Sequence, residues 1–210
     1  MGVSIPRLYA IIDPARLSGR LPRTAARELI SAGVRLVQFR DKRASSRQFY
    51  ETCKELRELL HGAGCSLIVN DRADVARAAS ADGVHLGQTD LPVEMARRVL
   101  ATGQWIGTST HSLEQVVEAD ATTADYIALG PIFPTASKEN PDPVVGLEGL
   151  RRARQSTSKP LVAIGGVNLQ NVREVFAAGA DSVAVIAALL DAPDLERRAR
   201  EFLALLDTLE

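Results

Sequence analysis

The strongest constraint on the fold is an alternation, repeated eight times, of short apolar runs with stretches of helical spacing. Each run is too short for a helix, and most are rich in β-branched side chains, as is typical of buried strands. The runs lie at 8–12, 36–40, 67–69, 83–86, 105–109, 126–130, 161–164 and 182–186. Strand, helix, strand units give parallel strands with right-handed crossovers, and eight of them predict a closed (β/α)8 TIM barrel, an α/β fold.

The size of the chain agrees with this fold. Its 210 residues are 46% hydrophobic, which is enough for a sizeable core, and the length is near that of a single α/β barrel. We therefore expect one catalytic domain over residues 1–210. An open doubly wound sheet is the alternative.

Composition argues against several classes of partner. The chain has 25 Lys plus Arg and 26 Asp plus Glu, and only 4% of its residues are aromatic, so no global field or set of stacking platforms favours nucleic acid or an anionic membrane. No signal-peptide pattern or membrane-length apolar run is seen, so we expect a cytoplasmic protein. Cys53 and Cys65 lack metal-ligand spacing and are expected to be reduced packing residues.

Two connecting segments carry further expectations. Pro92 is placed where a helix begins, and Met95, Val99 and Leu100 are predicted to form the inner face of that helix. The Pro-rich stretch 131–146 has neither strand nor helix period. A long connection of this kind inside a compact domain is usually functional, and we expect it to close over bound substrates.

Polar residues collect where the predicted strands end. In such barrels the catalytic groups lie on the loops after the strands, at one face. The residues at these positions are Asp13, Gln38, Arg40, Lys42, Asn70, Asp71, Asp90, Ser109, His111, Thr135, Ser137, Lys138, Gly165 and Gly166. Cations together with carboxylates suit a polyphosphate bridged by a divalent metal. Two carboxylates alone bind Mg²⁺ incompletely, so a pyrophosphate ester is the expected partner.

Structural roles are the alternative for the acidic residues. Asp71 could form an ion pair at the strand end with its neighbour Arg72, and Asp90 could cap the helix that begins near Pro92.

Structural roles are equally open for the other candidates. Arg40 and Lys42 could belong to a solvated loop, and His111 could be a hydrogen-bonding residue at a helix start. The pair Gly165-Gly166 is a weak signal by itself, although glycine amides before a helix form a phosphate cradle. The convergence of these residues on one rim favours a functional site.

Six motifs resemble those of the thiamine phosphate synthase family, and together they cover nearly the whole chain. They are VQFRDK at 37–42, NDR at 70–72, DGVHLGQTD at 82–90, IGTSTHS at 106–112, YIALGPIFPTASK at 126–138 and VAIGGV at 162–167. The resemblance implies a (β/α)8 transferase that joins the 4-amino-2-methylpyrimidin-5-ylmethyl group of a diphosphate to 4-methyl-5-(2-phosphoethyl)thiazole. The products are thiamine phosphate and pyrophosphate.

The resemblance also implies roles for individual residues. The diphosphate substrate is matched by Gln38, Phe39, Arg40, Asp41, Lys42, Asn70, Ser109 and Lys138, of which Arg40, Lys42, Ser109 and Lys138 are the catalytic candidates. Asp71 and Asp90 match the family positions that bind one Mg²⁺ per site. The positions that bind the thiazole phosphate are matched by Thr135, Ala136, Ser137, Gly166, Ile186 and Ala187, and Gly165 could take the place of Gly166. Two positions depart from many relatives. Ser137 replaces a threonine but keeps a hydroxyl. Ala187 replaces a serine and loses the hydroxyl, so one hydrogen bond to phosphate is lost unless backbone amides supply it.

The chemistry implied by the resemblance needs no nucleophilic side chain. The C–O bond to pyrophosphate breaks first, and the thiazole nitrogen captures the resulting pyrimidine-stabilised cation. Two other functions are compatible with the sequence: a thiazole tautomerase that uses His111 for proton transfer, and a non-catalytic thiamine phosphate binder. The tautomerase is less consistent with the paired acids Asp71 and Asp90, which such relatives often lack. The expected partners are small molecules, and a homo-oligomer is compatible with the sequence.

Overall fold

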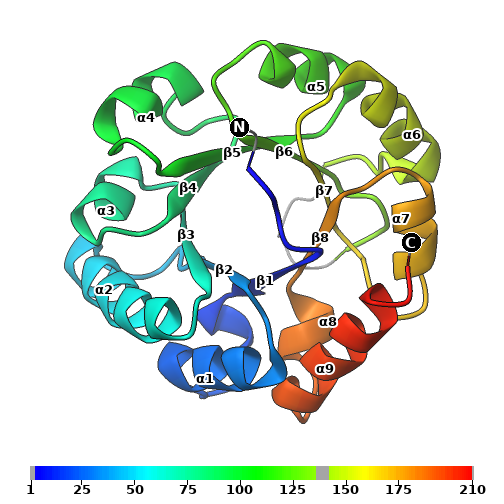
Figure 1. Ribbon diagram of the computed structural model, residues 1–210. Helices are drawn as coiled ribbons and strands as arrows, with labels where there is room; N and C mark the ends of the chain where they lie inside the picture. Colours follow the sequence, from blue (N-terminus) through cyan, green and yellow to red (C-terminus); the bar gives the residue numbers. More distant parts are fainter. Residues whose placement is uncertain (1–2, 136–141, 210) are drawn as a thin grey trace.

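The protein is a closed barrel of eight parallel strands in sequential order, which confirms the predicted fold (Figure 1). The structure is a computed structural model, and it describes residues 3–135 and 142–209. The strands are β1 (Leu8–Ile12), β2 (Leu36–Phe39), β3 (Ser66–Asn70), β4 (Gly83–Leu86), β5 (Trp105–Thr110), β6 (Tyr126–Leu129), β7 (Leu161–Ile164) and β8 (Ser182–Val185). The pairing of β1 with β8 closes the ring, so the open-sheet alternative is wrong.

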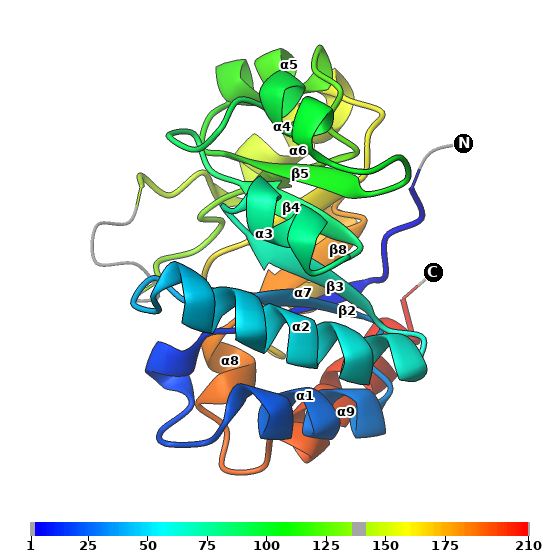
Figure 2. The same cartoon turned by 90° about the vertical axis from the view of Figure 1, so that its left-hand side faces the viewer.

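Helices surround the barrel and run back along its outer surface (Figures 1 and 2). They are α1 (Pro22–Ala32), α2 (Ser46–Gly62), α3 (Ala73–Ala78), α4 (Val93–Val99), α5 (Leu113–Asp120), α6 (Gly146–Ser156), α7 (Val172–Ala177), α8 (Ala187–Leu190) and α9 (Leu195–Leu206), with a 3₁₀ turn η1 at Pro14–Arg16. The sequence pattern missed η1 and α8. Among the described residues, none of these helices has the length and apolar character that a membrane crossing requires.

Strand side chains alternate between two apolar clusters, as the period of a strand requires. In β2, Val37 and Phe39 join the large cluster between the strands and the helices, whereas Leu36 belongs to a smaller cluster inside the barrel. Gln38 also faces inward, because its amide bonds to Tyr9 of that inner cluster. The inner cluster forms a floor below the carboxyl ends of the strands.

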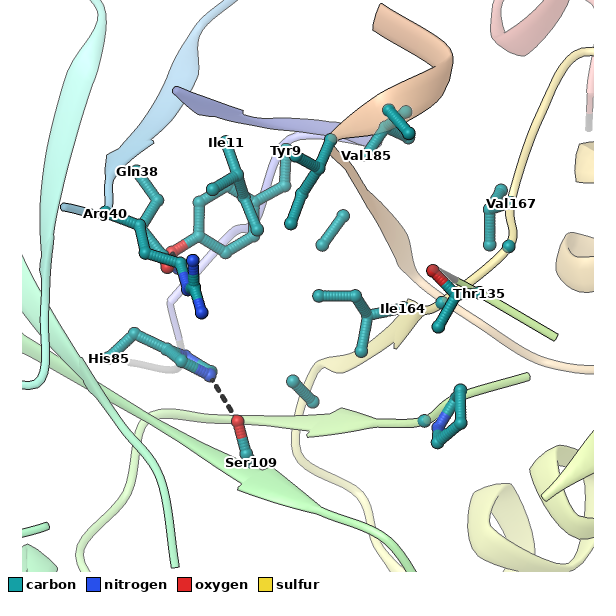
Figure 3. Close-up of a pocket in the computed structure, with 18 of the residues that line it drawn as sticks. Tyr9, Ile11, Gln38, Arg40, His85, Ser109, Thr135, Ile164, Val167 and Val185 are labelled. Atoms are coloured by element: carbon teal, nitrogen blue, oxygen red, sulfur yellow. Dashed lines mark hydrogen bonds between the residues drawn. The ribbon is translucent and has the colours of Figure 1, made fainter. Parts of the chain in front are cut away.

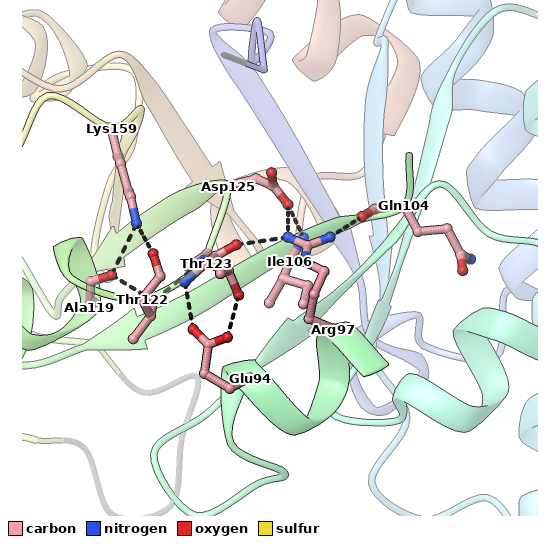
Figure 4. Close-up of polar contacts among 10 residues, drawn as sticks. Glu94, Arg97, Gln104, Ile106, Ala119, Thr122, Thr123, Asp125 and Lys159 are labelled. Atoms are coloured by element: carbon pink, nitrogen blue, oxygen red, sulfur yellow. Dashed lines mark hydrogen bonds and ion pairs between the residues drawn. The ribbon is translucent and has the colours of Figure 1, made fainter. Parts of the chain in front are cut away.

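Polar contacts at the opposite, amino-terminal face fasten the helices to the strands (Figure 4). Arg97 of α4 donates to the carbonyl of Thr123 at 2.8 Å and to the carboxylate of Asp125 at 2.5 Å. Lys159, just before β7, donates to the carbonyl of Thr122 at 2.6 Å. These bonds satisfy the loop carbonyls far from the carboxyl-terminal rim.

The expected inner face of α4 is wrong for two of its three residues. Met95 and Val99 are 42% and 39% exposed, whereas Ala96 and Leu100 are buried. This seven-residue helix carries apolar side chains on more than one side, so periodicity does not determine which side faces the strands.

Candidate active site

A pocket of about 140 Å³ opens at the carboxyl ends of the strands (Figure 3). Ten of the residues singled out in the sequence line it, namely Gln38, Arg40, Asn70, Ser109, His111, Thr135, Gly165, Gly166, Ile186 and Ala187. Tyr9 and Ile11 from β1 and Ala128 from β6 form part of its lower wall. An apolar interior with polar groups around it is typical of a small-molecule site.

Arg40 is held at the pocket by a carboxylate from the neighbouring strand. Its guanidinium donates to Asp13, which lies directly after β1 and is almost fully buried. The other carboxylate oxygen of Asp13 accepts from the backbone N–H of Ala15 at 3.0 Å, which fixes Asp13 at the start of η1. Because Arg40 is still partly exposed, it can bind an anion while Asp13 keeps it in place.

Asp71 is turned toward the loop after β2 by an unusual backbone conformation. Its φ is +63°, and its N–H donates to the carbonyl of His85 at 2.7 Å. Its carboxylate accepts from Lys42, whereas Arg72 pairs with Asp74 at 2.6 Å. The alternative that Asp71 exists to pair with Arg72 is therefore wrong.

Asp90 lies beside Asp71 and does not cap α4. One of its carboxylate oxygens accepts from the N–H of Gly87 at 2.7 Å, and the cap of α4 is Pro92, which makes no side-chain bond. Burial, followed by the neighbouring Asp71 carboxyl, raises the pKa of Asp90 above its usual range. Two like charges this close favour a bound cation.

This donor set fits Mg²⁺. The ion prefers oxygen ligands and is commonly held by one or two carboxylates, with water and substrate phosphates completing its shell. Within residues 3–135 and 142–209, no group of three or more His, Cys, Asp or Glu side chains is arranged around a common point. A pair of carboxylates leaves the other positions of an octahedral shell to water and to substrate oxygens.

The glycines after β7 are required by the path of the loop after β6. Gly165 and Gly166 have φ values of +95° and +67°, and a Cβ on them would lie 2.5 Å from Pro131 and 2.6 Å from Phe133. The loop pairs with this turn, since the N–H of Phe133 donates to the carbonyl of Gly165 at 3.0 Å. The loop that carries Thr135 is thereby brought to the β7 side of the pocket.

Residues 8–189 match the thiamine monophosphate synthase family. The chain belongs to this family. It is 52% identical over 210 residues to the thiamine-phosphate synthase of Koribacter versatilis, covering 98% of each chain, and 45% identical over 204 residues to that of Chloroflexus aurantiacus, covering 97% of this chain and 94% of the other. The solved structure of thiamine phosphate pyrophosphorylase from Pyrococcus furiosus is 40% identical and superposes with a TM-score of 0.86, covering 96% of this chain and 95% of that one.

Membership of the thiamine monophosphate synthase family confirms the predicted enzyme class. The activity is thiamine-phosphate synthesis, a group transfer that releases pyrophosphate.

Two of the family positions predicted to bind substrate have side chains that serve the scaffold. The ring of Phe39 stacks on Phe49 of α2, with centroids 5.2 Å apart, on the outer side of the barrel. The carboxylate of Asp41 accepts from the N–H groups of Arg43 and Ala44 at 2.9 and 3.1 Å. The side chain of Phe39 therefore cannot reach the pocket, and the prediction of a substrate contact is limited to its backbone. Three further predicted residues, Ala136, Ser137 and Lys138, lie outside the described part of the chain.

His111 is a hydrogen-bonding residue at the pocket wall. Its Nδ1 lies 2.5 Å from the carbonyl oxygen of Gly130, and its Nε2 lies 3.4 Å from a carboxylate oxygen of Asp142. The structural role considered for His111 agrees with these bonds.

Sequence reasoning did not select three polar residues of the barrel interior: Tyr9, His85 and Tyr126. They form hydrogen bonds with one another, and Tyr9 and His85 line the pocket. A signal was present, since His85 is a polar residue within the otherwise apolar strand GVHL. Nothing in that strand shows which of its two faces turns inward.

Proposed function

We propose that the chain transfers the 4-amino-2-methylpyrimidin-5-ylmethyl group from its diphosphate to 4-methyl-5-(2-phosphoethyl)thiazole, with Mg²⁺ held by Asp71 and Asp90. The observation that carries this proposal is the position of the two carboxylates and Lys42 on the same rim as Arg40 and the apolar pocket. An apolar ring fits the pocket, and a charged diphosphate fits the rim.

The residues of the rim act on the departing group. When the C–O bond breaks, its electron pair leaves with pyrophosphate, and negative charge grows on the oxygens at the mouth. Arg40 and Lys42, with Lys138 from the family pattern, stabilise that charge more in the transition state than in the bound substrate. Bound Mg²⁺ supplies further positive charge to the same oxygens.

The remaining pocket residues orient the two substrates. Gln38 and Asn70 are buried at 3% and 9% exposure and offer amide groups to the pyrimidine, and Ser109 offers a hydroxyl to the diphosphate. The thiazole nitrogen then attacks the electron-poor carbon, forming the C–N bond as the cation is consumed.

The thiazole phosphate is proposed to bind between the loop after β6 and the turns after β7 and β8. Thr135 contributes a hydroxyl, and Gly166, Ile186 and Ala187 contribute backbone groups, beside Ala136 and Ser137 of the family pattern. The first N–H groups of a helix lack intrahelical acceptors, so the start of α8 suits an anion even though Ala187 has no hydroxyl. A cytoplasmic location and a homo-oligomer remain parts of this proposal.

The test is a pyrophosphate-release assay with both substrates, in Mg²⁺ and in excess EDTA. We expect release only with Mg²⁺, and its loss in Asp90→Asn but not in the matched variant Asp74→Asn, since Asp74 is exposed, pairs with Arg72 and is not one of the residues that line the pocket. Equal release in EDTA would refute the metal site. Isomerisation of a thiazole without any pyrophosphate would favour the tautomerase that uses His111.

A further inference from the structure

A chain of hydrogen bonds crosses the interior of the barrel beneath the pocket, and its last bond, between His85 and Ser109, is the dashed line in Figure 3. It runs from Gln38 to Tyr9 at 2.8 Å, from Tyr9 to Tyr126 at 2.9 Å, from Tyr126 to Nδ1 of His85 at 3.1 Å, and from Nε2 of His85 to Ser109 at 2.9 Å. The three middle residues are at most 7% exposed. The two ends, Gln38 and Ser109, line the pocket and are the proposed contacts to the substrate.

The hydrogens of this chain can be placed so that both tyrosine hydroxyls donate within the chain. Gln38 presents its amide nitrogen to Tyr9 and must donate. Tyr9 then donates its single proton to Tyr126, which donates its own to Nδ1 of His85. A neutral imidazole that accepts at Nδ1 carries its hydrogen on Nε2, so His85 donates to Ser109. In the reverse order Tyr9 would accept from both Gln38 and Tyr126, and its own proton would have no acceptor within the chain.

Burial keeps both phenols of the chain protonated. It raises the pKa of Tyr9 and of Tyr126 above the usual 10.0. Each hydroxyl therefore remains a donor as well as an acceptor throughout the physiological pH range.

The strand between His85 and Tyr126 is built to let the two side chains meet. Gly107 of β5 is paired with His85 on one side and with Tyr126 on the other. A Cβ at Gly107 would lie only 2.0 Å from Cζ of Tyr126 and 2.4 Å from its hydroxyl oxygen. The tyrosine ring lies across this gap and stacks on the imidazole, with centroids 5.6 Å apart and planes 24° apart.

We propose that Tyr126 is a positioning residue that fixes His85 with its hydrogen on Nε2 and thereby turns the hydroxyl proton of Ser109 toward the pocket. Ser109 accepts from His85, and its own hydrogen is left to donate to an anionic oxygen of the diphosphate. Tyr126 touches no substrate and acts only through His85. The last step rests on the proposed function, because it takes Ser109 as a contact to the diphosphate.

The first test does not involve activity. The chain has only 3 histidines, so ¹⁵N-labelled histidine gives few signals, and two-bond ¹⁵N–¹H correlation spectra distinguish the two neutral tautomers. We expect the Nε2–H form of His85 in the wild type and a shift toward the Nδ1–H form in Tyr126→Phe, which keeps the ring but removes the donor. Tyr50→Phe on α2 is the matched control and should leave the spectrum unchanged. An Nδ1–H wild type, or an unchanged tautomer in a folded Tyr126→Phe, would overturn the proposal.

The second test asks whether Tyr126 acts through Ser109. Tyr126→Phe is expected to lower kcat about tenfold, equivalent to about 1.4 kcal/mol, with little change in KM. In the Ser109→Ala background the same substitution should cost less than twofold. If the factors by which Tyr126→Phe and Ser109→Ala each lower kcat simply multiply in the double variant, Tyr126 only supports the fold. If the wild type releases no pyrophosphate, the proposed function fails, while the tautomer measurement still decides the order of the chain.

Discussion

Replacing Gly107 with alanine tests the packing that the interior of the barrel requires. The new methyl group would lie 2.0 Å from Cζ of Tyr126, whereas carbon atoms in contact are about 3.5–4.0 Å apart. The ring or the strand must therefore move by at least about 1.5 Å. Overpacking of this kind costs about 1–3 kcal/mol, and a displaced hydroxyl leaves buried partners unsatisfied at a further cost of about 1–3 kcal/mol. Together these costs predict a melting temperature lower by about 5–20 °C for a chain of this size.

Thermal unfolding, followed by circular dichroism, measures this loss. Gly62→Ala is the matched control, because Gly62 lies in α2 and an added Cβ would meet nothing within 4 Å. It should be neutral or stabilising by up to about 1 kcal/mol. In a Tyr126→Leu background, which lacks the obstructing ring atoms, Gly107→Ala should cost less than half as much. A Gly107→Ala protein as stable as the wild type, or an equal cost in both backgrounds, would refute the packing argument.

Three further predictions concern the rim, the core and the phosphate site. Asp71→Asn should reduce turnover at least about 100-fold. The melting temperature should not change, because the side chain lies on the rim and the substitution removes a negative charge beside Asp90. A turnover like that of Asp74→Asn would contradict this. Burial raises the pKa of the Cys53 and Cys65 thiols from the usual 9.0 to about 12. Above pH 9.0 the unfolded state therefore loses thiol protons that the folded state keeps. The free energy of unfolding then falls by about 1.4 kcal/mol per pH unit for each thiol. Urea unfolding between pH 8 and pH 10.5 should show a shallower fall in the double Cys→Val variant, and equal slopes would contradict the assignment. Ala187→Ser should lower KM for the thiazole phosphate severalfold in steady-state assays, and an unchanged KM would mean that backbone amides already satisfy the phosphate.

The architecture was predictable because eight β-rich runs separated by helical patterns leave few topologies. Each of those runs overlaps one observed strand, and the register of parallel pairing then places Asn70 and Ser109 at a common rim. The positions of strand ends are fixed by where the apolar run stops, and that is visible in a single sequence. The rim was therefore accessible to sequence reasoning.

The interior of the barrel was not accessible in the same way. Strands buried on both faces read as continuous apolar runs, so the alternation that would separate Gln38 from Phe39 is hidden. The positive φ of Asp71, and the contact of its carboxylate with Lys42, depend on how the loops after β2 and β3 meet. The gap at Gly107 likewise depends on the register of three strands, β4, β5 and β6, so no single sequence motif reveals it.

The most direct test of the account is a crystal structure with Mg²⁺, pyrophosphate and thiamine phosphate. We expect carboxylate oxygens of Asp71 and Asp90 at about 2.0–2.1 Å from one metal ion, or joined to it through water, with that ion also bound to a pyrophosphate oxygen. Arg40 should contact the same pyrophosphate, and the pyrimidine should lie in the pocket above Tyr9. Pyrophosphate bound elsewhere, or a metal ion that contacts neither aspartate, would contradict it.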